Sequence, residues 1–264
     1  MTVPLTAGNP RVKEARRLSR RSVRTERRLF LVDGPKAVEG ALGVPGCVVE
    51  VFATPAATEQ HGDWADRVPR WTVVDDRALA SLSDSVTPAG VVAVCHQVDR
   101  PLAEVLGAAG DLRLVAVCAD VRDPGNAGTV IRTADAAGAD AVVLAGTSVD
   151  ASNPKTVRAT VGSLFHLPLA VDPDPAAVVR AARERGLQVL AADGAGETDL
   201  DEAERLLAAP TAWLFGNEAH GLPDDLAALA DHRVRIPIHG RAESLNLSTA
   251  AAVCLYASAR VQRR

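Results

Sequence analysis

Polar side chains gather in three loops of this 264-residue chain, in patterns that could hold a ligand. The last of these loops runs from Gly240 to Ser248, between a short β-branched run that ends at Ile238 and an Ala/Leu-rich segment of helical composition. A strand, a loop and a helix in that order place the loop at a sheet edge, where open α/β sheets bind ligands. Ser244 or Asn246 can cap the helix, and the first-turn amide groups beside them would then be free to meet a ligand. An ordinary helix cap is the alternative interpretation.

The second loop follows a long apolar run and contains Asn126, Gly128 and Arg132. The pattern predicts a buried parallel strand, a loop whose Asn126 caps the next helix, and a helix over 129–137. Gly128 and Arg132 would lie one turn apart, on the same face as Asp135, so a loop amide and a guanidinium could converge on one phosphate or ribose. A surface ion pair with Asp135 is the alternative role for Arg132.

The third loop runs from Gly216 to Gly221 and follows the apolar run 211–215. Its glycines let the backbone approach a ligand closely, and Glu218 stands at the end of a strand where an apolar residue is expected. A Rossmann nucleotide-binding domain, as in an oxidoreductase, is the rival interpretation of the strand–loop–helix unit around the second loop. Gly125 and Gly128 do not form the spaced glycine triplet of that fold, and no Walker-type lysine follows them.

Strands alternate with helical segments along the rest of the chain, which predicts an α/β layer structure. Residues 99–111 show no strand pattern and include Pro101 and the glycine-containing tract 107–110, so we place a domain boundary there. The predicted domains are residues 1–107 and 108–264. Because 47% of residues are hydrophobic and only 3% aromatic, both cores must rely on Ala, Val and Leu.

Basic residues gather near the N-terminus, although the net charge of the chain is -4. From Arg11 to Arg28 there are nine Lys or Arg residues and two Glu. The spacing of Val12, Ala15 and Leu18 predicts one helix over this region with an arginine face, whose potential is suited to phosphate. A solvated helix face is the alternative. The predicted RNA-contacting residues are Arg11, Arg16, Arg17, Arg20, Arg21, Arg24, Arg27 and Arg28.

Several classes of protein do not fit this sequence. No apolar run approaches the roughly 18 residues of a membrane span, and the N-terminus lacks the apolar core of a signal peptide, so we expect a cytoplasmic protein and no membrane partner. The four cysteines are scattered in apolar stretches, which predicts buried free thiols and no metal site. Neither His166 nor His239 has a nucleophile and a carboxylate in the order of a hydrolase triad.

Together, the three loops resemble the SpoU (TrmH) family of RNA ribose methyltransferases, within the SPOUT superfamily. Asn-x-Gly-x-x-x-Arg at 126–132 matches the first family motif, 216–222 resembles the second and 237–248 the third, in the family's order. The segment 150–168 is similar to a family segment near the cofactor and the dimer partner. The region before residue 107 resembles a substrate-binding domain of L30e type.

The resemblance implies a fold, a reaction and partners. It implies an α/β protein with an N-terminal L30e-like domain, and a C-terminal SPOUT methyltransferase domain with a deep trefoil knot. The cofactor would be S-adenosylmethionine and the active site would lie near the interface of a homodimer. The reaction would be methylation of a ribose 2′-hydroxyl in structured RNA, with ribosomal RNA favoured over tRNA. A non-catalytic RNA-binding protein that retains the fold is the alternative.

The resemblance also implies a role for each motif residue. Arg132 matches the arginine proposed to activate the hydroxyl; because a guanidinium keeps its proton, we expect it to orient the ribose-phosphate and stabilise the forming alkoxide. The other implied catalytic residues, which would hold Arg132 and the ribose in register, are Asn126, Glu218, Ser244 and Asn246. The implied cofactor-binding residues are Leu214, Phe215, Gly216, Asn217, Ile236, Ile238, Ser244, Leu245 and Asn246.

Overall fold

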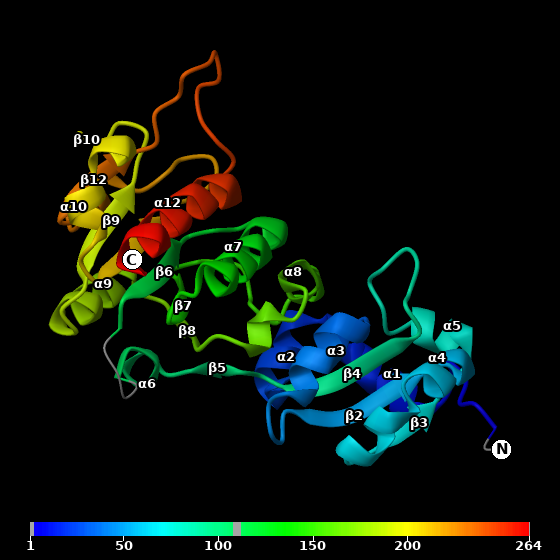
Figure 1. The fold of residues 1–264 in the computed structure, drawn as a ribbon. Helices are drawn as coiled ribbons and strands as arrows, with labels where there is room; N and C mark the ends of the chain where they lie inside the picture. Colours follow the sequence, from blue (N-terminus) through cyan, green and yellow to red (C-terminus); the bar gives the residue numbers. More distant parts are fainter. Residues whose placement is uncertain (1–2, 108–111, 264) are drawn as a thin grey trace. The chain divides into compact units, whose positions relative to one another are not determined.

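A computed structural model describes residues 3–107 and 112–263 (Figure 1). Packing divides the chain into two compact units, the N-terminal unit, Met1–Val98 with Asp150–His166, and the C-terminal unit, Asp99–Val149 with Leu167–Arg264. This division differs from the predicted boundary after residue 107 because Asp99–Arg100 pairs in the second unit's sheet, and because Asp150–His166 packs with the first unit. Part of the glycine-containing tract used for the boundary, residues 108–111, lies outside the described residues.

The N-terminal unit is built on a four-stranded sheet of order β1-β4-β2-β3. Its strands are β1 (Leu29–Asp33), β2 (Val48–Ala53), β3 (Trp71–Val73) and β4 (Val91–His96). The helices are α1 (Pro10–Arg16), α2 (Arg21–Arg27), α3 (Pro35–Leu42), α4 (Pro55–Gln60), α5 (Asp76–Ala80) and α8 (Pro154–Thr160). Short 3₁₀ helices span Arg17–Ser19, Gly62–Arg67 and Ser163–Phe165.

Alternation along β1 explains why a distant segment belongs to this unit. Leu31 packs in a buried cluster with Val12 of α1 and Val23 of α2. The ring of Phe30 stacks on the ring of Phe165, with 6.2 Å between the ring centroids. Successive side chains of a strand point to opposite faces of the sheet. Leu31 therefore packs on one face and Phe30 on the other. Phe165 belongs to the segment 150–166 and therefore supplies part of the N-terminal unit's packing.

The single helix predicted over the basic region is wrong, because α1 and α2 are separated by a 3₁₀ turn and an extended residue, Arg20 (φ −89°, ψ 129°). The carbonyl groups of Leu18 and Ser19 belong to this 3₁₀ turn. The guanidinium of Arg24 donates hydrogen bonds to both, at 3.1 and 2.8 Å. A charged side chain therefore closes the break, since buried carbonyl groups require a donor.

The C-terminal unit contains an eight-stranded sheet of order β10-β12-β9-β11-β6-β7-β8-β5, in which every pair is parallel. Its strands are β5 (Asp99–Arg100), β6 (Leu114–Ala119), β7 (Ala141–Ala145), β8 (Leu169–Asp172), β9 (Gln188–Ala192), β10 (Thr198–Asp199), β11 (Thr211–Phe215) and β12 (His232–Arg235). The helices are α6 (Leu102–Gly107), α7 (Pro124–Ala137), α9 (Pro175–Glu184), α10 (Glu204–Leu207), α11 (Asp224–Ala227) and α12 (Leu247–Gln262), with a 3₁₀ helix over Leu200–Glu202. The α/β layer structure is therefore confirmed.

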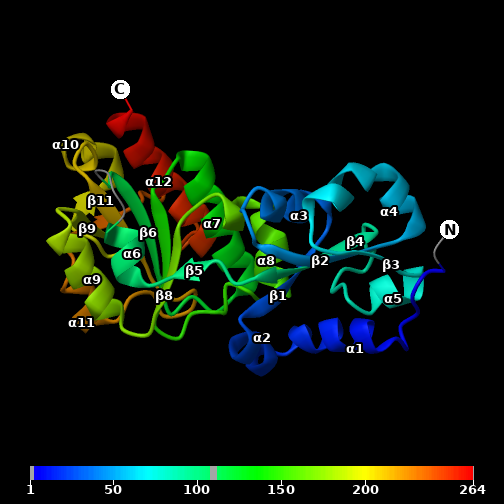
Figure 2. The same ribbon diagram turned by 90° about the horizontal axis from the view of Figure 1, so that it is seen from below.

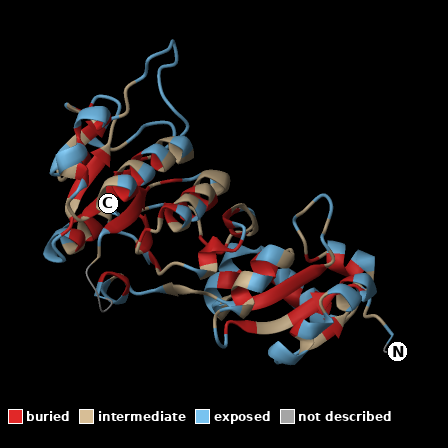
Figure 3. Ribbon diagram, in the orientation of Figure 1, coloured by how far each residue is buried: buried red, intermediate tan, exposed pale blue. Residues whose placement is uncertain are grey.

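Helices cover both faces of this sheet. One face packs in a core with α6, α9 and α11, while α7 and α12 pack on each other and on β6 (Figure 2). The indole nitrogen of Trp213 donates a hydrogen bond of 2.9 Å to Ser258 Oγ, which fixes α12 on β11. Buried residues concentrate in the central strands of both sheets (Figure 3). Among the described residues, no helix is both long and apolar enough to cross a membrane.

The ends of two helices decide where the site residues lie. Helix α7 begins earlier than predicted, at Pro124, because Asp123 caps it by accepting a hydrogen bond from the amide of Asn126 at 2.8 Å. The prediction that Asn126 is the cap is therefore wrong, and Gly128 lies inside the helix and not in a loop. The prediction that Asn246 caps the C-terminal helix is confirmed.

Candidate functional site

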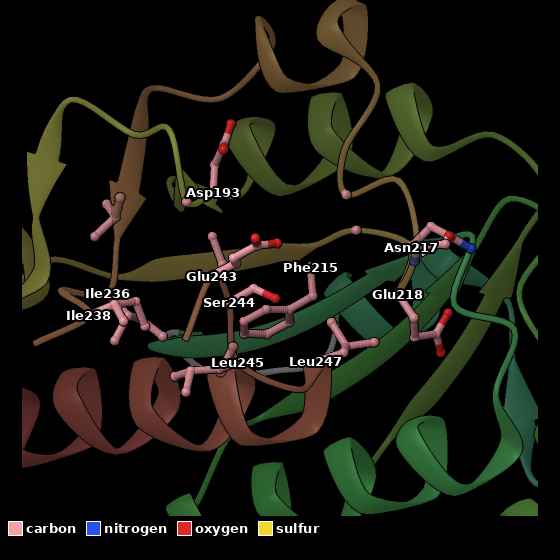
Figure 4. A pocket seen from close by; sticks show the side chains of 17 residues that line it. Asp193, Phe215, Asn217, Glu218, Ile236, Ile238, Glu243, Ser244, Leu245 and Leu247 are labelled. Carbon is pink, nitrogen blue, oxygen red and sulfur yellow. Dashed lines mark hydrogen bonds between the residues drawn. The ribbon is translucent and has the colours of Figure 1, made fainter. Parts of the chain in front are cut away.

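A cavity of about 330 Å³ opens where β9 and β11 end at their carboxyl edge (Figure 4). The predicted cofactor-binding residues that line it are Phe215, Gly216, Asn217, Ile236, Ile238, Ser244 and Leu245. Strand β12 ends at Arg235, so the predicted β-branched run lies past the strand, in the segment that leads to α12. The cavity is therefore walled by three stretches of the chain: the loop after β9, the loop after β11 and the segment that leads to α12.

Two predicted cofactor-binding residues lie elsewhere. The side chain of Leu214 is fully buried in the core on the face covered by α9, because strand alternation turns it away from the side of Phe215. Asn246 lines a neighbouring cavity. Conversely, Asp193 and Glu243 line the first cavity and were not predicted. Asp193 follows the apolar strand β9, and that position was the available sequence signal.

The loop after β11 is held in a tight turn. The amides of Asn217 and Gly221 donate to each other's carbonyl groups, both at 2.9 Å. A Cβ atom on Gly216 would lie 2.4 Å from the carbonyl carbon of Gly221, so only glycine fits there. The side-chain amide of Asn217 donates to the carbonyl of Asp120 at 2.8 Å, and Asp120 adopts a left-handed conformation (φ 56°). Asn217 therefore joins the second and third predicted loops.

Glu218 accepts hydrogen bonds from a set of donors in the second predicted loop. The backbone amides of Arg122 and Asp123 donate at 3.2 and 3.0 Å, and the side-chain amide of Asn126 donates at 3.2 Å. Partial burial alone would raise the pKa of Glu218, but hydrogen bonds from its own amide, from both backbone amides and from Asn126 outweigh burial and lower it. Glu218 is therefore an ionised acceptor at neutral pH.

Asn246 extends this network to the last loop. Its side-chain amide nitrogen donates to Asn126 Oδ1 at 3.0 Å, while its oxygen accepts from the amide and the hydroxyl of Ser248 at 2.9 and 2.7 Å. The chain of hydrogen bonds Asn246–Asn126–Glu218 thus joins all three predicted loops. These three residues also line a second cavity, of about 960 Å³, which shares Asn217, Glu218, Ala219 and Gly221 with the first.

The second cavity also contains residues that sequence reasoning missed. Arg122, Asp123 and His220 line it. The guanidinium of Arg122 lies 3.4 Å from Thr147 Oγ1, and His220 Nδ1 lies 3.3 Å from Asn217 Oδ1. Both side chains are exposed and sit next to motif residues in the sequence, which was the signal that could have identified them.

Arg132 is not brought together with the other predicted catalytic residues. It is exposed on α7 and lines neither cavity. Within the part of the chain that the structure describes, no hydrogen bond or ion pair involves Arg132, so the alternative pairing with Asp135 is not formed. Gly128 is buried within α7, and its amide cannot converge with Arg132 as a loop amide would.

The predicted arginine face separates into different environments. Arg24 is 2% exposed and pairs with Asp150 at 2.6 Å, so its prediction as an RNA contact is wrong. Three others have carboxylate partners: Arg11 pairs with Glu50, and both Arg17 and Arg27 pair with Glu14. Arg28 is exposed and has an interaction partner. Arg16, Arg20 and Arg21 are exposed, with no ion pair to any described residue.

All four cysteines are free and buried, as predicted. Burial raises the pKa of Cys118 and of Cys254 to about 12, which makes both thiols unreactive at neutral pH. Among the described residues, no group of three or more His, Cys, Asp or Glu side chains could hold a metal ion.

Comparison with known proteins assigns the chain to a family. Residues 113–256, more than half of the chain, match the model of the SpoU rRNA Methylase family, and residues 9–93 match the MRM3-like substrate binding domain. The chain belongs to the SpoU rRNA methylase family. The resemblance carried by the three loops is therefore confirmed, and the Rossmann oxidoreductase interpretation is wrong.

Relatives resemble this SpoU family member over almost its entire length. The 23S rRNA (guanosine(2553)-2′-O)-methyltransferase RlmP of Bacillus subtilis is 35% identical, over 95% of this chain and 96% of that protein. The structure of an AdoMet-bound rRNA methyltransferase from Sinorhizobium meliloti is 34% identical and has a TM-score of 0.84, over 96% of this chain and 95% of that one. The SpoU methyltransferase AviRb from Streptomyces viridochromogenes, in complex with AdoMet, is 31% identical with a TM-score of 0.84, over 97% and 99% of the two chains.

Proposed function

We propose that this protein transfers the methyl group of S-adenosylmethionine to a ribose 2′-hydroxyl of structured RNA, and that the RNA is ribosomal and not tRNA. The observation that carries the proposal is the hydrogen-bonded chain Asn246–Asn126–Glu218, which lies at the wall shared by two adjacent cavities. Relatives named as 23S rRNA 2′-O-methyltransferases support the same reaction and the same class of RNA.

The first cavity fits S-adenosylmethionine. Its apolar residues, including Phe215, Ile236 and Leu245, suit an adenine ring, and glycines on both strand-end loops leave backbone groups accessible. The described residues that line it include the carboxylates of Asp193, Glu218 and Glu243 and no Lys, Arg or His. Negative side chains favour a ligand with a sulfonium and an ammonium group, whereas they would repel the phosphates of a nicotinamide dinucleotide.

The second cavity fits the nucleotide that receives the methyl group. When bound, the cofactor supplies an activated methyl group, so the protein's part is to position the hydroxyl and to stabilise developing charge. Glu218 is held ionised by its donors and fixes the orientation of the Asn126 amide. Asn126 and Asn246 then present fixed polar groups to a ribose. Arg122 and His220 line the same cavity and could contact a phosphate or a base.

We further propose that the protein acts as a homodimer in which Arg132 of one subunit serves the cavity of the other. The support is that Arg132 is exposed on α7 and lines neither cavity of its own chain. Helix α7 packs on α12, where Val253 and Tyr256 are 38% and 52% exposed. Exposed apolar side chains on such a face suit a subunit interface. There, Arg132 would orient the ribose-phosphate and stabilise the alkoxide.

Finer features of the fold belong to the same proposal. Residues 1–107 act as an RNA substrate-binding domain of L30e type, and residues 108–264 act as the SPOUT catalytic domain with a trefoil knot. The matches to two family models, on either side of that boundary, support the division. The knot is supported by the loop after β11 and the segment between β12 and α12, both of which contribute lining residues to one cavity. A protein that modifies ribosomal RNA would act in the cytoplasm.

The experiment is methyl transfer from radiolabelled S-adenosylmethionine by the purified protein. The substrates are ribosomal RNA and tRNA from a strain that lacks the gene, and nuclease digestion followed by mass spectrometry identifies the product. The proposal expects a 2′-O-methylnucleoside in ribosomal RNA. A protein that binds cofactor and RNA without transfer would support the non-catalytic alternative, and a base-methylated product would exclude the proposed reaction.

A further inference from the structure

A second polar site lies in the N-terminal unit, which contains none of the residues of the three motif loops. It is a cavity of about 500 Å³ whose lining includes Gly8, Lys13, Arg16, Asp75 and Arg77. None of these residues belongs to the three motif loops, and only Arg16 was among the predicted RNA contacts. We call this site the basic cavity.

Backbone pairing builds the basic cavity from three separate segments. The amide of Leu5 donates to the carbonyl of Val73 at 2.9 Å, and the amide of Asp75 donates to the carbonyl of Leu5 at 3.0 Å. These bonds hold the N-terminal segment beside the end of β3, next to α5, which carries Arg77. Asn9 caps α1, which carries Lys13 and Arg16, with its side-chain oxygen 2.9 Å from the amide of Arg11. The cations therefore stand on a fixed frame.

Charge in the basic cavity is not balanced by the protein. Lys13, Arg16 and Arg77 are exposed, and no ion pair or hydrogen bond joins their charged groups to any residue that the structure describes. The one carboxylate of the lining, Asp75, accepts a hydrogen bond from the amide of Ala78 at 2.6 Å and caps α5. Three cations and one carboxylate give the lining a positive charge that attracts an external anion.

Other arginines of the same region show what a purely structural role looks like. Arg11, Arg17 and Arg27 all have a carboxylate partner, and Arg24 is buried against Asp150. Arg16 is only one residue from Arg17, yet it has no such partner among the described residues. Three cations around one concavity, without a carboxylate partner in the described chain, attract an anion, which makes ligand binding the better explanation of their placement.

We propose that Lys13, Arg16 and Arg77 form a phosphate-binding site for the backbone of the RNA substrate. This inference rests on the proposed function, because that function supplies a polyanion as the partner. Phosphates are the charged groups that RNA presents at regular spacing, and each cation that neutralises one phosphate releases a counterion. The basic cavity would contribute affinity and docking without contributing to the chemical step.

The test compares two triple variants of the full-length protein that lose the same charge from the same unit. Lys13→Ala/Arg16→Ala/Arg77→Ala removes the basic cavity, whereas Arg17→Ala/Arg27→Ala/Arg70→Ala removes two paired arginines and one exposed arginine that does not line the basic cavity. Binding of a short fluorescein-labelled oligouridylate is measured by anisotropy between about 50 and 200 mM salt. Thermal unfolding of each variant monitors the fold, and the single variants Lys13→Ala and Arg77→Ala replace the triple variant if its melting temperature falls.

The basic-cavity variant should bind more weakly at low salt, and its log–log salt slope should be shallower by about 2, since each phosphate contact on a single strand contributes about 0.7. The control variant should change the slope by less than half as much. Equal changes in the two triple variants, or an unchanged slope in the basic-cavity variant, would overturn the proposal. Equal weakening for labelled polyglutamate would assign the site to an acidic protein instead. Methyl transfer is also measured with the same wild-type preparation. If the wild type transfers methyl groups but the basic-cavity variant binds RNA normally, the site proposal fails and the proposed function stands.

Discussion

The polar groups of the two units are arranged in opposite ways. In the C-terminal unit, Glu218, Asn126 and Asn246 bind one another, so each has a fixed orientation before any ligand arrives. In the N-terminal unit, Lys13 and Arg16 line a concave surface without a partner among the described residues. Chemistry at one atom requires orientation within a fraction of an ångström, whereas attraction of a polyanion requires only charge held in the right region. On the proposed function, the C-terminal unit positions the reacting group and the N-terminal unit holds the RNA backbone.

The largest expected effect is on turnover, from Arg132. Arg132→Ala should lower kcat by roughly a thousandfold, as is typical when a group that stabilises transition-state charge is removed, with little change in RNA affinity. Arg132→Lys should not restore kcat, because an ammonium group lacks the planar fork that holds two oxygens. Single-turnover kinetics with RNA binding measured in parallel separates the two quantities. Near-normal turnover of the lysine variant would contradict the bidentate geometry.

Arg24 offers the matching test in the other unit, with stability as the readout. Arg24→Ala removes one partner of a buried ion pair and leaves Asp150 without its cation, so the free energy of unfolding should fall by about 3 kcal/mol. The exposed Arg20→Ala serves as the control and should change stability by less than about 0.5 kcal/mol. Urea unfolding measures both values. Equal stability of the two variants would show that the Arg24–Asp150 pair does not hold the N-terminal unit together.

Asn246 can be separated into its two functions. Asn246→Asp keeps an oxygen that caps α12 but loses the amide that donates to Asn126, so kcat should fall by roughly thirtyfold to a hundredfold while the melting temperature stays close to the wild-type value. Asn246→Ala should lose kcat and, in addition, about 1 kcal/mol of stability from the missing cap. Methyl transfer and thermal unfolding of both variants provide the measurements. An active Asn246→Asp enzyme would remove the hydrogen-bonded chain from the mechanism.

The smallest expected effect is the pH dependence of stability due to Glu218. Its pKa is lowered in the folded state, so its contribution to stability is present above the unfolded pKa of about 4.5 and is lost as the pH falls through the lower folded value. Glu218→Gln should therefore differ most from the wild type at neutral pH and converge with it in acid. Urea unfolding of both proteins between about pH 3 and 7 measures the difference. A difference that grows as the pH falls would have the wrong sign.

Local patterns in the sequence predicted much of this arrangement. The alternation of strands and helices, the three loops and the cap at Asn246 depend on residues that are neighbours in the sequence. They can therefore be predicted from the sequence alone. The cap of α7 was assigned to Asn126 because Asp123 and Asn126 are both good capping residues, and only the position of Pro124 at the first turn distinguishes them. The Asp123 cap starts the helix at Pro124, earlier than an Asn126 cap would, and leaves the Asn126 side chain free to join Glu218.

Other features depend on partners far along the chain and were not predictable from local patterns. Arg24 is separated from Asp150 by 126 positions, so nothing near Arg24 distinguishes it from its exposed neighbours. The segment Asp150–His166 lies between strands of one unit and packs in the other, which a single linear boundary cannot describe. The place of Glu243 in the cavity lining is set by how loops meet in space.

The central claim is that the hydrogen-bonded loops of the C-terminal unit methylate a ribose of ribosomal RNA. Mapping of 2′-O-methyl groups across all ribosomal RNA and tRNA of a strain that lacks the gene tests it most directly, with complementation by the wild-type gene and by the Arg132→Ala variant. We predict that one ribosomal site loses its methyl group, that the wild type restores it and that the Arg132→Ala variant does not. An unchanged methylation map, or a lost site found only in tRNA, would contradict the account.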